Sequence, residues 1–159
     1  MGVGLVLIPS HRRHSASFLL RVAPIFEGGK EDRRMSETEE RARGTISLAI
    51  SNGAVRLLHE YTGRGPTKAR TTINHDSVMI LFGDSLTKAE RTLAEKGDGA
   101  VVLQMRHRFQ EAMRDDLVGL VETETGRKVV AFMSANHIEP DMAAEIFALE
   151  PVPETAVAE

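Results

Sequence analysis

Residues 61–70, "YTGRGPTKAR", combine two glycines, a proline and three cations in one short segment. Glycines let backbone N–H groups approach a ligand, and the planar Arg64 guanidinium suits a carboxylate, bicarbonate or phosphate. If a strand begins near Thr67, Lys68 and Arg70 point to the same side of it. The segment therefore predicts a site for an anion or an acidic partner, made of Gly63, Arg64, Gly65, Pro66, Lys68, Arg70 and, from a later helix, Arg106.

The same residues also fit a purely structural turn. Gly63 is placed to end a helix in the left-handed conformation, and Pro66 pushes Gly65 towards extended geometry. The pair would convert a helix into a strand within a few residues. No lysine of a phosphate-binding loop follows the glycines. A structural turn with a solvated cationic face and a binding site both remain open from the residues alone.

A second candidate site is the segment "NHIEPD", where polar and ionisable side chains crowd an expected loop. Loops on a rigid scaffold often carry function. A metal ion needs two or more oriented ligands, but this spacing matches no recognised ligand pattern, and loop capping uses the same residue types. We expect no metal and no cofactor here, and the candidate residues of this loop are Asn136, His137, Glu139 and Asp141.

Two smaller groups of ionisable residues have simpler interpretations. The string "NHD" places His75 beside Asp76, which suits proton transfer but also a hairpin turn. The string "RHR" would extend a basic patch, yet on an amphipathic helix we expect Arg106 and Arg108 to form solvated ion pairs. No G-x-S-x-G nucleophile turn occurs. The sequence therefore predicts no catalytic residue.

The composition excludes several classes of protein. The chain has 159 residues and no cysteine, which excludes disulfides and thiolate metal sites and fits a reducing cytoplasm. No tryptophan, one tyrosine and a net charge of −3 argue against a nucleic-acid partner. No apolar run approaches the roughly 18 residues of a membrane span. We expect a cytoplasmic protein that binds no nucleic acid and does not insert into the membrane directly.

Charge and local signals indicate where the domain begins. Residues 1–35 carry six Lys/Arg against three acids, whereas residues 36–159 carry fourteen against twenty. The string "MSETEE" places Ser36 as a helix N-cap with Glu39 at capping-box spacing. We expect residues 1–35 to be a disordered extension or a start-site artefact, residues 36–151 a single domain, and residues 152–159 a disordered tail.

The positioning elements follow from hydrophobic periodicity. Apolar residues at helical spacing predict helices over 45–61 and 99–123, with a shorter helix after the capping box of Thr87 and Glu90. "KARTTIN" and "SVMILFG" predict a hairpin that turns at residues 74–77, and "KVVAFMSA" and "EIFALE" predict two more strands, joined by "NHIEPDMA". The fold class is therefore α+β, an antiparallel four-stranded sheet with helices packed on one face in the order α-β-β-α-α-β-β.

Two packing details follow from the same patterns. Alternating apolar residues in "SVMILFG" predict a central strand that is covered on both faces. The five methionines from Met79 onward fall mainly at predicted core positions, which favours packing over a cofactor site.

Three strings in this order resemble a bacterial family of small cytoplasmic proteins: "GRGP", "LTKAERTL" and "VETETGRKVVAFMSANHIEPDMAAEIFALEP". The family is called MpsC-like, and older descriptions name it a Na+-translocating decarboxylase subunit. The resemblance covers roughly residues 36–151. In the family "SDNH" is commoner where "SANH" stands here, so Ala135 replaces a carboxylate, which puts any acid–base role of that acid in doubt. The matching positions are Gly63, Arg64, Gly65, Pro66, Leu86, Thr87, Glu90, Arg91, Arg106, Gly126, Arg127, Asn136, His137 and Pro140.

The resemblance implies an accessory component of a membrane-potential-generating system whose membrane parts are linked to sodium and to inorganic carbon uptake, and it implies no established catalytic residue. We therefore expect a non-catalytic accessory or regulatory binding module that reaches the membrane through transporter subunits. We also expect a homodimer, because the core is small and the sheet is apolar. The alternative, suggested by the older family name, is an enzyme of decarboxylation or carbon-hydration type with His137 or His75 as proton carrier.

Overall fold

The computed structural model describes residues 31–151, so the expectations for residues 1–30 and 152–159 lie outside the described residues. The predicted order α-β-β-α-α-β-β is confirmed. Its elements are α1 (Glu31–Thr62), β1 (Lys68–Ile73), β2 (Ser77–Gly83), α2 (Lys88–Glu95), α3 (Gly99–Thr125), β3 (Val129–His137) and β4 (Met142–Leu149).

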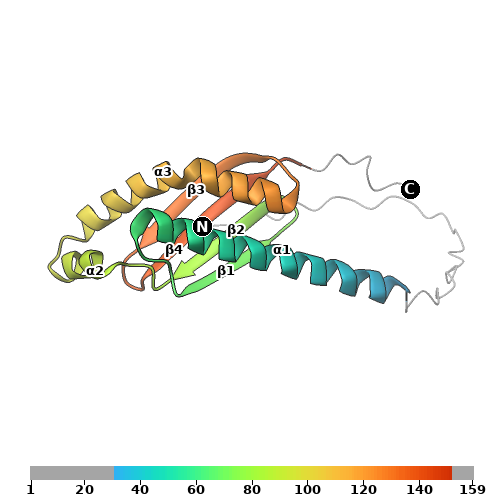
Figure 1. The fold of residues 1–159 in the computed structure, drawn as a ribbon, viewed down its shortest axis with the longest axis horizontal. Coiled ribbons are helices and arrows are strands. Elements are labelled where there is room, and N and C mark those ends of the chain that lie inside the picture. Colours follow the sequence, from blue (N-terminus) through green and yellow to red (C-terminus); the bar gives the residue numbers. More distant parts are fainter. Residues whose placement is uncertain (1–30, 152–159) are drawn as a thin grey trace, which may run out of the picture.

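The four strands form one antiparallel sheet in the order β1-β2-β4-β3. α1 packs on β1, α3 packs on β3, and the two long helices also contact each other. Figure 1 shows both helices on the same face of the sheet, with α2 beyond one end. The α+β fold with helices on one face is therefore confirmed, and it consists of two layers.

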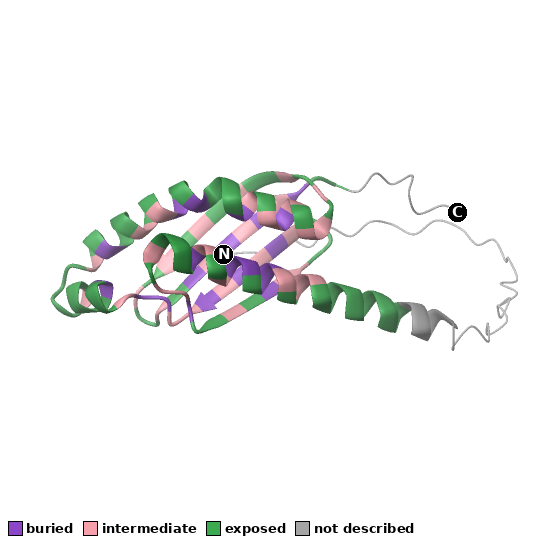
Figure 2. Cartoon of the chain, in the orientation of Figure 1, coloured by how far each residue is buried: buried purple, intermediate pink, exposed green. Residues whose placement is uncertain are grey.

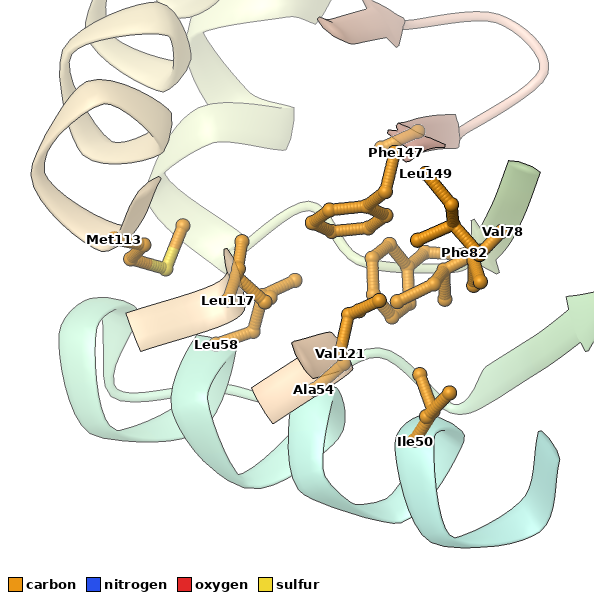
Figure 3. Packing of buried hydrophobic residues seen from close by; sticks show 12 residues of the cluster. Ile50, Ala54, Leu58, Val78, Phe82, Met113, Leu117, Val121, Phe147 and Leu149 are labelled. Atoms are coloured by element: carbon orange, nitrogen blue, oxygen red, sulfur yellow. The ribbon is translucent and has the colours of Figure 1, made fainter. Parts of the chain in front are cut away.

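The hydrophobic core fills the space between the helix layer and the sheet. Figure 3 shows Ile50 and Ala54 of α1, Leu117 of α3, and Phe82 and Phe147 of β2 and β4 directed towards one another. These five side chains are at most 1% exposed. Each helix buries the side on which its apolar residues recur about every 3.6 positions, and each strand buries the side formed by every second residue. These buried sides form the core.

The predicted helix ends agree with the structure except at the first. Gly63 and Gly126 have φ values of +74° and +67°, as expected for residues that end a helix. Thr87 and Glu90 form the predicted capping box before α2. The predicted start at Ser36 is wrong, because α1 runs through this residue from Glu31. Acidic residues near a helix N-terminus stabilise the helix in whichever of its first turns they lie, so the acids after Ser36 did not fix the residue at which α1 begins.

Three packing predictions are corrected by the structure. β2 is central, but only its Val78, Ile80 and Phe82 side faces the helices. The segment joining the last two strands is shorter than predicted, because β3 includes Asn136 and His137. Among the five methionines from Met79 onward, Met113 alone is buried, and Met105, Met133 and Met142 are exposed.

Figure 2 shows that the buried residues gather where the two long helices cross the sheet, whereas residues 36–45 of α1 are exposed. Gly53 of α1 lies at the closest approach of the helices, since a Cβ built there would be 2.6 Å from Leu120 of α3. The segments after α1 and after β2 meet at one end of this layer. That end holds most of the predicted site residues.

Candidate functional site

The turn after α1 connects two parts of the domain through Arg64. The Gly63 N–H donates to the His59 carbonyl oxygen at 2.9 Å and completes the helix. Arg64 Nη2 lies 3.3 Å from Asp84 Oδ2, and Arg64 Nη1 donates to the Leu86 carbonyl oxygen. The Arg64 side chain is 34% exposed. Its guanidinium therefore fastens the end of α1 to the segment between β2 and α2.

Asp84 is the carboxylate around which this segment is organised. It has a φ of 54°, and it accepts hydrogen bonds from the Thr67 hydroxyl at 2.8 Å and from Arg91 Nη2 at 3.0 Å. The hydrogen bond from Thr67 does most to lower the pKa of Asp84 below its usual value, and Arg91 and Arg64 lower it further. Asp84 therefore stays ionised and links Arg64 with Arg91.

Asp141, at the end of the second candidate loop, caps the same segment. Its Oδ1 accepts from the Ser85 N–H and hydroxyl, both at 3.1 Å, and its Oδ2 accepts from the Leu86 N–H at 2.8 Å. A hollow of about 260 Å³ lies beside it, lined also by Arg91 and Glu139. The loop residue Asp141 thus has a structural role, while Glu139 faces an open hollow.

Arg106 of α3 is the centre of the network. It makes five hydrogen bonds: Nε and Nη2 to the two Glu90 oxygens at 2.9 and 3.1 Å, Nη1 to Ser85 Oγ and Asn136 Oδ1, and Nη2 to the Ser85 carbonyl. Arg106 and Glu90 are 11% and 4% exposed. Burial acts to raise the pKa of Glu90, but the bonds from Arg106 and Thr87 outweigh it and lower the pKa. This buried pair is therefore ionised.

The expected solvated ion pairs on α3 are confirmed at one position and wrong at the other. Arg108 lies 3.5 Å from Glu111 at the surface. Arg106, two residues earlier, points inward instead. The helix positions 106, 110, 113 and 117 form one side of α3, and that side faces the sheet.

A chain of amides carries the network into the core. Asn136 Nδ2 donates to Gln110 Oε1 at 2.7 Å, and Gln110 Nε2 donates to Glu145 Oε1 at 3.0 Å. Glu145 is 1% exposed, and its Oε2 has no hydrogen-bond partner among the described residues. Burial raises the pKa of Glu145 to about 7, although Ser134 and Gln110 act in the opposite direction. The Arg106 network therefore ends on a carboxyl group that titrates near neutrality.

A small cavity of about 20 Å³ lies inside this network. Its polar lining includes Arg64, Glu90, Arg106, Gln110, Asn136 and Glu145. That volume suits about one water molecule. The structure thus brings Arg64 and Arg106 of the first predicted site to one cavity, together with Asn136 of the second.

The remaining predicted residues lie apart from this cavity. His137 is exposed at the end of β3, where its Nδ1 lies 2.9 Å from the Pro140 carbonyl oxygen. His75 is exposed in the hairpin at the opposite end of the sheet and pairs with Asp76. In residues 31–151 no group of three His, Cys, Asp or Glu side chains is placed to hold a metal ion.

Lys68 and Arg70 project from the sheet face that the helices leave uncovered. Both are exposed, and neither has a hydrogen-bond or ion-pair partner in the described part of the chain. They border a shallow hollow of about 460 Å³ that Leu81 and Met142 also line. The first predicted site is thus divided between two faces of the sheet.

We call this uncovered side the open face, formed by the strand side chains that point away from α1 and α3. Its strand positions are in register, so that Arg70 lies beside Leu81 and Met79 beside Ile146 and, further on, Met133. No described element packs on it. Its members are mainly apolar, with Lys68, Arg70 and His137 as the basic ones, and none of them is Asp or Glu.

Sequence reasoning missed the acidic and amide partners of the network: Asp84, Glu90, Gln110 and Glu145. Two of them carried a signal. Glu145 falls on the inward side of β4, between Ala143 and Phe147, where a carboxyl group is unusual. Glu90 was identified as a capping residue, but its pairing with Arg106 depends on the packing of α2 against α3.

The fold and these contacts define a small two-layer α+β domain with an internal arginine network and a sheet face on which no described element packs. Residues 42–151 match the model of the MpsC family, which is described as the Na+-translocating membrane potential-generating system. The chain therefore belongs to the MpsC family. No curated protein matches it, and neither does any solved structure. None of the described helices is long and apolar enough to cross a membrane.

Many positions of the family resemblance have structural roles here. Gly126 ends α3, and Arg127 donates to the carbonyl oxygens of His75 and Glu150, which fastens the end of the sheet. Thr87 caps α2 and Arg106 holds the network together. The positions that carry the resemblance are thus largely residues that stabilise the fold. The function of the open face has to be inferred from the residues on that face.

Proposed function

We propose that this chain is a non-catalytic accessory module of the Na+-translocating membrane-potential-generating system, and that it binds an acidic segment of a partner protein on its open face. The observation that carries the proposal is a pair of cations, Lys68 and Arg70, that have no partner within residues 31–151 and lie beside an exposed apolar surface. Cations at the rim of an apolar patch favour partners of opposite charge and suppress wrong ones.

The apolar part of the open face supports a protein partner over a small free anion. Met133 and Met142 are 51% and 40% exposed, and both point away from the helices. Methionines on a surface adapt to different partners, because the side chain is unbranched and flexible. A contiguous apolar patch rimmed by polar residues is typical of an interaction site.

The cationic residues of the first predicted site have different roles in this proposal. Arg64 is bonded to Asp84 and to the Leu86 carbonyl oxygen, so it serves to fix the turn of residues 63–66. Arg106 is bonded to Glu90, so it serves to hold α2 against α3. Lys68 and Arg70 remain free for an acidic partner. A partner that is anchored in the membrane would bring this domain to the membrane surface, since none of the described helices could cross a membrane.

A second copy of this chain is the competing occupant of the open face. Two copies stacked through this face would bring both Lys68 and Arg70 pairs into one interface, and the face offers no carboxylate to neutralise them. Like charges across an interface cost free energy. We therefore favour a different, acidic partner over the expected homodimer.

The test is co-purification of the tagged chain with the membrane proteins of the same system. The variant Lys68→Glu/Arg70→Glu is compared with Arg56→Glu/Lys96→Glu, which reverses two exposed charges outside the sheet. We expect the first variant to lose partner recovery about tenfold or more and the second to keep it, with circular dichroism unchanged in both. Equal recovery with the two variants, or recovery that rising salt does not reduce, would contradict the proposal.

A further inference from the structure

Glu145 is a buried carboxyl group that the proposed docking does not use. It lies on the inner side of β4, with Oε1 bonded to Gln110 and Oε2 without a partner in the described chain. The Ser134 hydroxyl, on the strand position opposite Glu145, is also buried; it lies near enough to lower the pKa of Glu145, but it makes no hydrogen bond of normal geometry within the described chain. An ionised Glu145 would thus keep a charged oxygen in the core without a well-formed hydrogen bond, which is costly.

Among the residues that the structure describes, no charged neighbour neutralises Glu145. The charged side chains that share its cavity are Arg64, Glu90 and Arg106. Arg106 uses its donors on Glu90, Ser85 and Asn136, and Arg64 is bonded elsewhere. The neighbours from α1, β2 and β3 carry no charge: Leu58 and Thr62 line the cavity, Ile80 is the strand partner on β2, and Ser134 and Asn136 lie on β3.

A proton is the ligand that fits this environment. The oxygens of Gln110 and Asn136 that face the cavity already accept hydrogen bonds, so a metal cation would find few free ligands. A protonated Glu145 gains an O–H donor, for which the Ser134 hydroxyl or one water in the cavity of about 20 Å³ is the acceptor.

We propose that Glu145 is a proton-binding site whose occupancy holds residues 106–117 of α3 on the sheet. With the proton bound, the carboxyl group is neutral, and the hydrogen bonds that link Glu145 through Gln110 and Asn136 to Arg106 are all formed. We call this the closed state. Without it, the buried charge favours a state in which α3 separates locally and water reaches Oε2. Burial raises the pKa of Glu145 to about 7, so this step falls near neutral pH. The inference does not depend on the docking proposal.

The test is a 13C NMR titration of the glutamate side-chain carboxyl groups in the full chain, with Glu145 identified through its own backbone. We expect the Glu145 resonance to titrate near pH 7 and amide protection in residues 106–117 to fall about tenfold across that range, after correction for intrinsic exchange. Titration of every glutamate below pH 5.5 would overturn the proposal, because Glu145 would then be ionised in the closed domain.

Two comparisons separate proton binding from simpler effects. Glu145→Gln keeps the size and supplies donors, so we expect it to remove the change in amide protection, whereas Glu95→Gln, at an exposed position of α2, retains it. If Glu145→Gln does not fold, the titration of the wild-type chain still shows whether Glu145 binds a proton near pH 7. An apparent pKa that NaCl lowers and KCl does not, at equal ionic strength, would also overturn the assignment, since a metal cation would then compete for Oε2.

Discussion

At the residue scale, Arg106 connects three parts of the chain that are distant in sequence. Its five hydrogen bonds reach Ser85 before α2, Glu90 within α2 and Asn136 on β3. A planar guanidinium can serve such a set of acceptors at once, whereas a lysine ammonium cannot. This side chain thus determines how α2, α3 and the end of β3 are held together.

Replacing Arg106 with alanine is expected to lower the free energy of unfolding by about 3–5 kcal/mol, because the buried Glu90 carboxylate loses its partner. Urea denaturation measures this change. Arg108→Ala is the matched control, since Arg108 is exposed and its one partner in the described part of the chain is Glu111, and its effect should stay within about 0.5 kcal/mol. Similar losses for both variants would show that Arg106 does not hold the network.

Glu145 leads to a pH prediction with a definite sign. Its pKa is raised from 4.5 to about 7 in the folded chain, so between these values the folded state binds more protons than the unfolded state. Stability should therefore fall as pH rises from about 4.5 to 7, by roughly 3 kcal/mol, and then level off. Denaturation at a series of pH values measures this slope, and Glu145→Gln should flatten it. An unchanged slope in that variant would assign the effect to other groups.

Individual residues were predicted unevenly, for a physical reason. The helix-ending glycines and the capping box act within four residues, so local sequence determines them. The inward direction of Arg106 depends on Glu90 and Ser85, which lie 16 and 21 residues away, and no local pattern reports such a pairing. The anion site was predicted from the types of its residues, but the side of the sheet that each faces follows from the tertiary packing.

At the scale of elements, the order and type of every helix and strand were predictable because each has a clear hydrophobic period. The ends were less certain. β3 extends to His137 because its pairing with β4 continues to Met142, and pairing between distant strands overrides the polar character of "NH". The start of α1 at Glu31 likewise lies before the local cap signal.

Gly119 within α3 and Gly126 at its C-terminal end lead to opposite predictions for the same substitution. Gly119 is exposed within α3 and a Cβ there meets nothing within 4 Å, so Gly119→Ala should raise the free energy of unfolding by about 0.5–1 kcal/mol. Gly126 has a φ of +67°, which an alanine adopts only with strain, so Gly126→Ala should lower the free energy of unfolding by about 1 kcal/mol. Thermal denaturation compares the two. Equal shifts would contradict the left-handed end of α3.

At the scale of the whole molecule, two long helices and four strands make two layers, and no element of residues 31–151 packs on the other side of the sheet. The prediction that β2 is covered on both faces was wrong for this reason, and so was the prediction that the methionines lie in the core. An apolar side chain in a strand favours burial, but its pattern does not say whether the cover comes from the same chain. In the proposed docking, Met79, Met133 and Met142 contact the partner.

The central claim is that the open face is where an acidic partner binds. Its most direct test places a photoactivatable crosslinking residue at Met133 of the open face and, separately, at Val101 of α3, which is an exposed apolar position of 53% away from the sheet. The crosslinked protein and peptide are then identified in native membranes. We predict an adduct from position 133 with an acidic segment of a protein of the same system, and none from position 101. An adduct formed from position 101 alone would contradict the claim.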